Sequence, residues 1–367
     1  MKSKFIRAVL LQFSGIMGAG IFALPYILYN SNFFWSVIGM FLITIITAIV
    51  NIFYVQIICN TQGDHQLPGY AKKYLGEKFK YLALMSLVIS GLGVMLACIK
   101  LGSGFIQILW PISSFFAVVF FLLLIIIGYL LKIKKIKIIL DYLPFVAILI
   151  VLLLLQIVLI NPLPEIELQS FNLAFFGVAV FALSGFTVIP EMEEILRGEK
   201  KVKIKLAWAS TMGLFLALVV YVIFSYAIIK LVGNNLTEDS VTGLAKTSYL
   251  TAGIIAVFGL LITFKGSINF MNVFHEIFYR DFKVTEKLSS LLAVVLPITT
   301  LLLFNLSFGS IFGGIGAGSI FVSIIIICLM MFKLKKNYLI SSLIILILIV
   351  FCNWIEKVAI HMRLLGS

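Results

Sequence analysis

Charge is scarce in this chain of 367 residues, because Asp, Glu, Lys and Arg together make up only 12% of it. Soluble domains carry about twice that share of charge and fewer apolar residues than the 62% found here, so a soluble globular protein is excluded. The charges cluster between apolar runs of about 20 residues, the length that crosses the hydrocarbon core of a bilayer as a helix. The sequence therefore predicts an all-α protein that spans a lipid bilayer many times.

Acidic residues are rarer than basic ones, with 15 Asp and Glu against 28 Lys and Arg, and the net charge is +13. A nucleic-acid-binding protein concentrates such charge on a folded soluble face. No soluble segment of this chain is long enough to offer one, so we expect no nucleic-acid partner. The basic residues are interpreted instead as signals of membrane orientation.

Cysteine and catalytic motifs are also sparse. The four cysteines lie in or beside apolar runs without a CxxC pair. Asp64 and His65 share a loop that offers no third ligand, so no metal site is expected there. The chain contains no Walker loop, nucleophile elbow, HExxH or haem motif. We therefore expect neither an enzyme nor a cofactor.

Apolar periods bounded by charge or turn residues predict eleven membrane-spanning helices. No segment between them is large enough to fold alone, so residues 1–367 are predicted to form one transmembrane domain. The approximate bounds of the spans are 6–29, 33–58, 80–109, 115–131, 140–160, 171–196, 206–230, 249–279, 289–306, 311–332 and 337–355.

Most of the 28 Lys and Arg residues lie in alternate connections between these spans. Short cytoplasmic loops are enriched in Lys and Arg, so this distribution predicts a cytoplasmic N-terminus. Eleven spans then leave the C-terminus outside. The expected location is the cytoplasmic membrane, which the chain crosses as a multi-pass protein.

A loop at 161–172 divides the chain after the fifth span. Repeat one at about 6–160 and repeat two at about 171–332 then hold five spans each, followed by an extra helix at about 337–355. An odd number of spans inverts the second copy relative to the first, as in many transporters. The predicted fold is a five-plus-five inverted repeat with one additional C-terminal helix.

The first span contains Gly15, Gly18 and Gly20, followed by Pro25. Glycine is common where membrane helices pack closely, and close packing is one interpretation of this pattern. Three glycines near mid-span are more than one packing contact requires, and they favour an unwound stretch. Uncovered backbone is tolerated in hydrocarbon only against protein or beside a cavity that holds a polar ligand.

The sixth span repeats this pattern, with Ser184 and Gly185 near its middle. Pro190 follows Gly185 at the same distance as Pro25 follows Gly20. Glycine and proline interruptions at corresponding positions of two halves point to the binding site of a transporter. The sequence therefore predicts that the first and sixth helices are both broken near the middle of the membrane.

Two broken helices offer opposite partial charges to a ligand. The N–H end of a half-helix favours a carboxylate, and its carbonyl end favours an ammonium. An α-amino acid carries both groups and suits such a site. Phe181 and Phe186 flank the second break and are candidates for covering the substrate, although packing is the usual role of a phenylalanine.

The two segments resemble the amino acid/polyamine/organocation transporter superfamily, and most closely its amino acid and aromatic amino acid permease branches. GIMGAGIFALP (Gly15–Pro25) is similar to the first-helix motif, and VFALSGFTVIPEMEEI (Val180–Ile195) is similar to the sixth-helix pattern. The resemblance implies alternating access, with the substrate carboxylate near the first break and its amine near the second. The substrate-binding residues that it implies are Ser14, Gly15, Ile16, Met17, Gly18, Ala19, Gly20, Phe181, Ala182, Leu183, Ser184, Gly185 and Phe186.

Two lysines fall inside predicted spans. An ionisable residue within a span is a functional candidate, unless it lies close enough to the end to reach the interface. Lys265 lies near the middle of its span, whereas Lys100 lies nearer the outer end. In relatives of this fold a lysine ammonium can replace a coupling cation. We therefore expect Lys265, ahead of Lys100, to exchange the coupling proton, since burial lowers the pKa of lysine.

The preferred interpretation is a secondary active amino acid transporter that works by alternating access and is coupled to protons. Sodium coupling and uncoupled exchange remain open on the sequence alone. The alternative is a receptor subunit on the same fold, of the spore germination type, which binds amino acids without transporting them. Activity of the purified chain alone separates the two interpretations.

Overall fold

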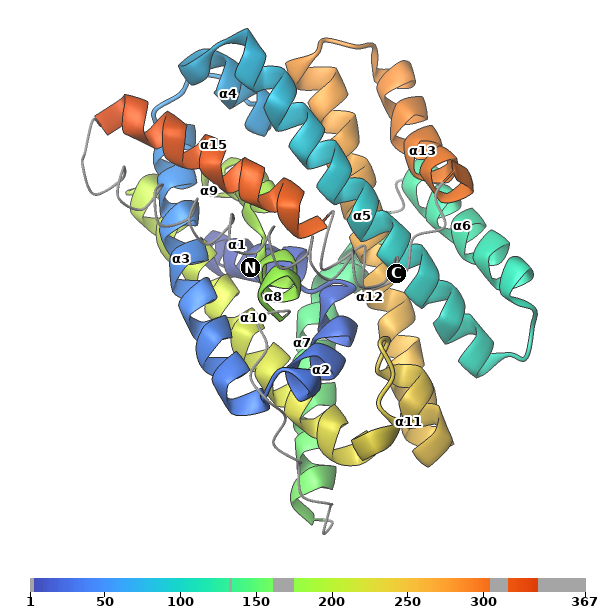
Figure 1. The fold of residues 1–367 in the computed structure, drawn as a ribbon. Coiled ribbons are helices and arrows are strands. Elements are labelled where there is room, and N and C mark those ends of the chain that lie inside the picture. Colours follow the sequence, from blue (N-terminus) through green and yellow to red (C-terminus); the bar gives the residue numbers. More distant parts are fainter. Residues whose placement is uncertain (1–2, 132–133, 161–174, 304–315, 336–367) are drawn as a thin grey trace, which may run out of the picture.

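The computed structural model describes residues 3–131, 134–160, 175–303 and 316–335, and within these ranges every regular element is helical (Figure 1). Hydrocarbon offers no hydrogen-bond partner to backbone N–H and C=O groups, and an α-helix satisfies them internally. The α-helices are α1 (Lys4–Ile16), α2 (Gly20–Asn30), α3 (Phe33–Cys59), α4 (Leu67–Leu75), α5 (Glu77–Leu109), α6 (Ser114–Leu131), α7 (Lys134–Ile160), α8 (Phe175–Leu183), α9 (Ile189–Leu196), α10 (Val202–Val232), α11 (Val241–Thr247), α12 (Tyr249–Glu276), α13 (Glu286–Leu303) and α15 (Ala317–Lys335).

Three shorter helical segments join these elements. Phe186–Val188 and Gly233–Asn235 form 3-10 turns, and Ile277–Asp281 continues α12 as a π-helical turn. Among the described residues, eight helical segments are long and apolar enough to cross a membrane, and the bent pair α1 and α2 makes a ninth. α7 corresponds to the fifth predicted span.

The helix bounds largely follow the sequence prediction. α7 begins at Lys134 rather than near residue 140, because neither Gly nor Pro interrupts its basic first turns. The short helices α4 and α11 lie in connections for which no helix was predicted. The predicted span at 337–355 and the dividing loop at 161–172 lie outside the described residues.

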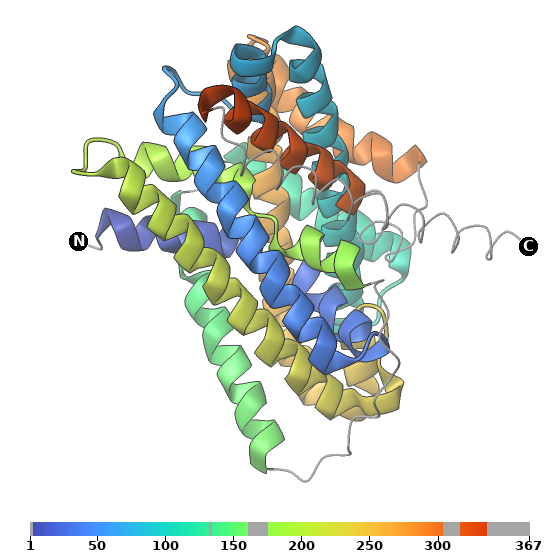
Figure 2. The ribbon, with the colours of Figure 1, turned by 60° about the vertical axis from the view of Figure 1, so that its left-hand side comes forward.

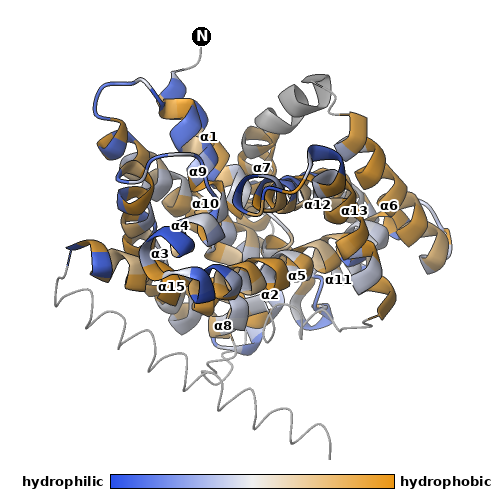
Figure 3. Cartoon of the chain, turned by 90° about the horizontal axis from the view of Figure 1, so that it is seen from above, coloured by the Kyte–Doolittle hydropathy of each residue, from blue (hydrophilic) through white to orange (hydrophobic). Residues whose placement is uncertain are grey.

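Two peripheral helices present apolar side chains to their surroundings. Seen from above, α6 and α13 carry mostly hydrophobic residues (Figure 3). Phe115 of α6 is 71% exposed, and Leu302 and Leu303 of α13 are 79% and 75% exposed. Such surfaces are stable against lipid chains rather than water.

The long antiparallel helices α5 and α12 define the two ends of the bundle. α4 precedes the first turn of α5, and α11 precedes the first turn of α12, so the two short helices lie at opposite ends (Figure 1). The hydroxyl of Tyr249 donates to the carbonyl of Ile108 at the α11 end, over 3.0 Å. At the α4 end, the N–H of Gly69 donates to the carboxylate of Asp281 over 3.0 Å.

Small residues bring the long helices close together. Gly259 of α12 lies under the ring of Phe105, and Gly91 of α5 lies under the ring of Phe274. α3 and α10 also lie side by side along much of their length (Figure 2). The two broken helices pack between these long helices, with α2 against α8 and α1 against α9.

Candidate functional site

The first break separates α1 from α2. α1 ends at Ile16, α2 begins at Gly20, and the two axes differ by 59°. Met17 leaves the helical conformation, with a ψ of 100°. The break therefore lies where the glycine-rich motif of the first span predicted it.

The second break interrupts the sixth span at the predicted residues. α8 ends at Leu183, and Ser184 and Gly185 are not helical. A 3-10 turn follows before α9 begins at Ile189. Pro190 occupies the first turn of α9, where its missing N–H breaks no intrahelical hydrogen bond.

The two breaks lie against each other through their glycines. A Cβ atom on Gly20 would lie 2.8 Å from the Cβ of Ala182, and one on Gly15 would lie 2.8 Å from a methyl group of Val188. Gly18 has no such close neighbour. Gly15 and Gly20 thus serve close packing as well as the break, whereas Gly18 lies within the break itself.

Tyr221 of α10 connects the two breaks. Its buried hydroxyl donates to the carbonyl of Ile16 over 2.7 Å, and the carbonyl of Ala182 lies 3.4 Å away. These carbonyls belong to the ends of α1 and α8, where intrahelical partners run out. Tyr221 therefore satisfies backbone that the breaks expose and holds the two half-helices together.

The other hydroxyl groups of the predicted site also bond to backbone. Ser184 donates to the carbonyl of Phe181 over 2.9 Å, and Ser14 donates to that of Leu11 over 3.2 Å. Gln12 of α1 is different, because its carboxamide is fully buried and neither Oε1 nor Nε2 has a hydrogen-bond partner among the described residues. An unpaired buried polar group costs about 1–3 kcal/mol.

Aromatic side chains cover the breaks on both sides. Towards the α11 end, the ring centroid of Phe22 lies 4.9 Å from that of Phe105 and 5.7 Å from that of Phe224. Ser240, which precedes α11, donates to the carbonyl of Phe22 over 2.6 Å. Towards the α4 end, the ring of Tyr54 lies 6.4 Å from that of Phe186.

The two lysines within spans occupy different surroundings. Lys265 of α12 is only 7% exposed. Lys100 of α5 lines a cavity of about 350 Å³, together with residues from α5 and from the segment at the start of α11: Leu101, Thr237, Glu238, Asp239 and Thr242. Only Lys265 is therefore enclosed by the bundle.

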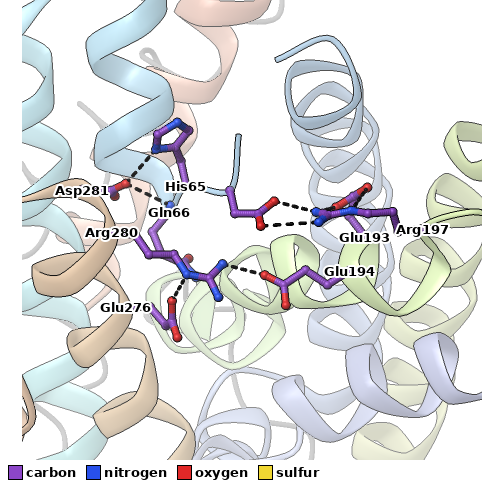
Figure 4. A network of polar contacts seen from close by, with 9 residues as sticks. His65, Gln66, Glu193, Glu194, Arg197, Glu276, Arg280 and Asp281 are labelled. Atoms are coloured by element: carbon purple, nitrogen blue, oxygen red, sulfur yellow. Dashed lines mark hydrogen bonds and ion pairs between the residues drawn. The ribbon is translucent and has the colours of Figure 1, made fainter. Parts of the chain in front are cut away.

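Arg197, directly after α9, joins three parts of the α4 end (Figure 4). Its guanidinium contacts Asp64 in the loop before α4 and Glu193 of α9, each over 2.5 Å. Its carbonyl accepts a hydrogen bond of 3.3 Å from Lys4 of α1. These contacts tie the end of the sixth span to the neighbouring loop and to the first helix.

The charge pair formed by Arg197 is sensitive to acid. The hydrogen bond from Arg197 lowers the pKa of the Asp64 carboxyl, and the hydrogen bonds to Glu193 and Asp64 raise the pKa of Arg197. The pKa of Asp64 is lower in the folded state than in the unfolded chain. The ion pair therefore stabilises the fold fully at pH values above the unfolded-state pKa of about 3.9. This stabilisation is lost as the pH falls through the lower pKa that Asp64 has in the folded state.

A second cluster at the α4 end surrounds the last turn of α12. Arg280 contacts Glu194 of α9 over 2.6 Å and Glu276 of its own helix (Figure 4). Asp281, whose side chain is fully buried, accepts hydrogen bonds from the start of α4 and lies 3.2 Å from the ring of His65. These carboxylates pair with arginine and backbone N–H groups, and the described residues contain no group of three or more His, Cys, Asp or Glu side chains that could hold a metal ion.

The inverted-repeat fold and the two paired breaks define a membrane transporter. The chain belongs to the tryptophan/tyrosine permease family, whose model matches residues 1–352. It is accordingly a secondary transporter that works by alternating access, and not an enzyme. No curated protein matches the chain.

Solved structures of transporters share the fold. A mutant form of the manganese transporter of Eremococcus coleocola has a TM-score of 0.67 at 14% identity, covering 95% of this chain and 84% of that one. The nucleobase-cation-symport transporter Mhp1, closed around bromovinylhydantoin, has a TM-score of 0.61 at 13% identity, covering 88% and 77%. An outward-open Na+-coupled sialic acid symporter also has a TM-score of 0.61 at 13% identity, covering 91% and 79%.

The structure brings the two predicted groups of site residues together and adds two residues that the sequence analysis missed. Gly20 lies against Ala182, and Ile16 lies against Gly185. Nothing in the sequence distinguished Tyr221 among the 13 tyrosines. Gln12 did carry a signal, because it is a polar residue inside an apolar span just before the glycine motif.

Replacing Tyr221 by Phe should destabilise the protein, because the carbonyl of Ile16 then stays buried without its donor. We expect a loss of about 1–3 kcal/mol, seen as a lower midpoint of thermal unfolding in detergent. Tyr249→Phe is the matched control, since it removes a hydroxyl bonded to a carbonyl at the exposed α11 end. Equal shifts for the two variants would contradict the role assigned to Tyr221.

Replacing Arg197 by Gln should loosen the α4 end, because Asp64 and Glu193 lose the cation that they share. We expect the backbone amides of α9 to exchange with deuterated water several-fold faster than in the wild type. Lys205→Gln breaks the separate 2.7 Å pair with Glu199 and should leave α9 unchanged. Unchanged exchange in Arg197→Gln would show that its ion pairs do not hold this end closed.

Proposed function

We propose that this protein transports amino acids, with aromatic amino acids as the preferred substrates, and that protons drive the transport. The observation that carries the proposal is the contact between the two helix breaks in a member of the tryptophan/tyrosine permease family. The resemblance of the broken segments to amino acid permeases supports the same substrate class. The first and sixth spans would then supply the binding residues named above, from Ser14 to Gly20 and from Phe181 to Phe186.

Opposite helix ends lie side by side at the breaks. Gly20 begins α2, whose N-terminal N–H groups carry partial positive charge, and Ala182 lies in the last turn of α8, whose carbonyls carry partial negative charge. A Cβ on Gly20 would touch the Cβ of Ala182 at 2.8 Å, so the two ends are adjacent. The α-carboxylate and α-ammonium of an amino acid are attached to one carbon atom, so the two groups can reach adjacent helix ends. This arrangement supports a zwitterionic substrate.

The orientation proposed for the chain puts the α4 end in the cytoplasm and the α11 end outside. The basic residues support it, because the loops at the α4 end carry most of them. The protein would then lie in the cytoplasmic membrane as one domain of two inverted repeats. Opening of the α4 end would release substrate into the cell.

Lys265 is the proposed coupling residue. It is 7% exposed in the middle of α12, and an ionisable residue inside a membrane span is a functional candidate. In this scheme the protonated side chain holds the first-helix break and the neutral side chain releases it. Lys100 is the weaker candidate, because it lines a cavity with polar residues.

The proposed function is tested with the purified chain in liposomes. An inward proton gradient should drive accumulation of labelled L-tryptophan or L-tyrosine above the level reached without a gradient. A sodium gradient at constant pH should not drive accumulation of either amino acid. Binding of these amino acids without accumulation would favour the receptor interpretation, and accumulation driven only by sodium would overturn proton coupling.

Replacing Lys265 by Gln should abolish gradient-driven uptake, because the residue can no longer exchange a proton. Exchange of labelled for unlabelled amino acid across the membrane should survive, since this needs no net proton movement. Lys100→Gln, the matched control, should keep most of the coupled uptake. Full pH-dependent uptake by Lys265→Gln would exclude this coupling role.

A further inference from the structure

Gln12 lies on α1 between the second break and α10. A Cβ on Gly185 would lie 2.8 Å from Nε2 of Gln12, and one on Gly213 would lie 2.6 Å from its Cβ. The Gln12 side chain has no exposed surface. It therefore fills the contact where α1 meets α10 and the sixth-span break.

The carboxamide of Gln12 gains no hydrogen bond from this contact. Ser14, Ser184 and Tyr221, which are hydroxyl residues of the spans that meet at the breaks, all donate to backbone carbonyls. Oε1 and Nε2 of Gln12 have no partner within the described part of the chain. An apolar side chain of similar length would fill the same space without a desolvation penalty.

Gln12 precedes the first break, on the side of the α4 end. At the start of the same helix Lys4 donates to the carbonyl of Arg197, a residue of the ion-pair network. α1 also packs against both α9 and α10. Movement of α1 away from these helices would expose the Gln12 carboxamide to water.

We propose that Gln12 is a positioning residue of the transport cycle, whose buried carboxamide weakens the packing of α1 in the closed state and gains hydrogen-bond partners when the α4 end opens. The partner is water that reaches the carboxamide as α1 moves. A residue that raises the free energy of one state shifts the equilibrium towards the other. The proposal extends the proposed function, since it identifies a residue that sets how readily the transporter opens.

Replacing Gln12 by Met tests this, because Met fills a similar volume without polar atoms. We expect a higher midpoint of thermal unfolding. The backbone amides of residues 4–16 should exchange with deuterated water about tenfold more slowly than in the wild type. Maximal uptake of L-tryptophan or L-tyrosine should fall several-fold, while the KM changes less than twofold. Gln12→Leu provides a second apolar variant if Gln12→Met does not fold.

Ser225→Ala is the matched control. Ser225 also has a buried hydroxyl without a partner among the described residues, but it lies in the C-terminal half of α10. This variant should leave exchange of 4–16 and the uptake rate unchanged. Faster exchange in Gln12→Met would overturn the proposal, and so would a lower unfolding midpoint.

A large rise in KM for Gln12→Met at an unchanged maximal rate would also overturn it, because Gln12 would then contact the bound substrate. The exchange measurement needs no substrate. If the wild type transports neither amino acid, the proposed function fails, and slower exchange in Gln12→Met still supports the conformational role of Gln12.

Discussion

The absence of hydrogen-bond partners in hydrocarbon governs this structure, because each helix break exposes backbone that the lipid cannot satisfy. The two breaks meet at the centre of the bundle instead of facing lipid. The Tyr221 hydroxyl donates to the carbonyl of Ile16, close to that of Ala182, and the positive end of α2 lies beside the negative end of α8. A zwitterion matches the remaining polarity, so the arrangement that brings the breaks together is compatible with the amino acid site that we propose.

Close packing at the breaks depends on glycines, which have no side chain. Gly20 admits Ala182, Gly185 admits Ile16 and Gln12, and Gly213 lets α1 approach α10. Each contact joins separate parts of the chain, and where function requires movement between such parts, high stability reduces it. Gln12, whose carboxamide has no hydrogen-bond partner within the described part of the chain, is consistent with this balance in the role that we propose for it.

Charge is concentrated away from this apolar centre. At the α4 end, Arg197 and Arg280 connect α9 to the loop before α4 and to α12 (Figure 4). Exposed ion pairs are weak individually, and a network of several charges contributes more than an isolated pair. The α11 end is covered differently, by the rings around Phe22 and the hydrogen bond from Ser240.

The helical membrane fold and the position of both breaks could be predicted from the sequence, since apolar length, glycine and proline act locally along the chain. The sequence did not predict α4, α11 or the roles of Tyr221 and Gln12. Tyr221 is distant in sequence from Ile16 and Ala182, and the burial of Gln12 depends on Gly185 and Gly213. These contacts arise in the folded chain, because hydrogen bonding and desolvation depend on which distant residues folding brings together.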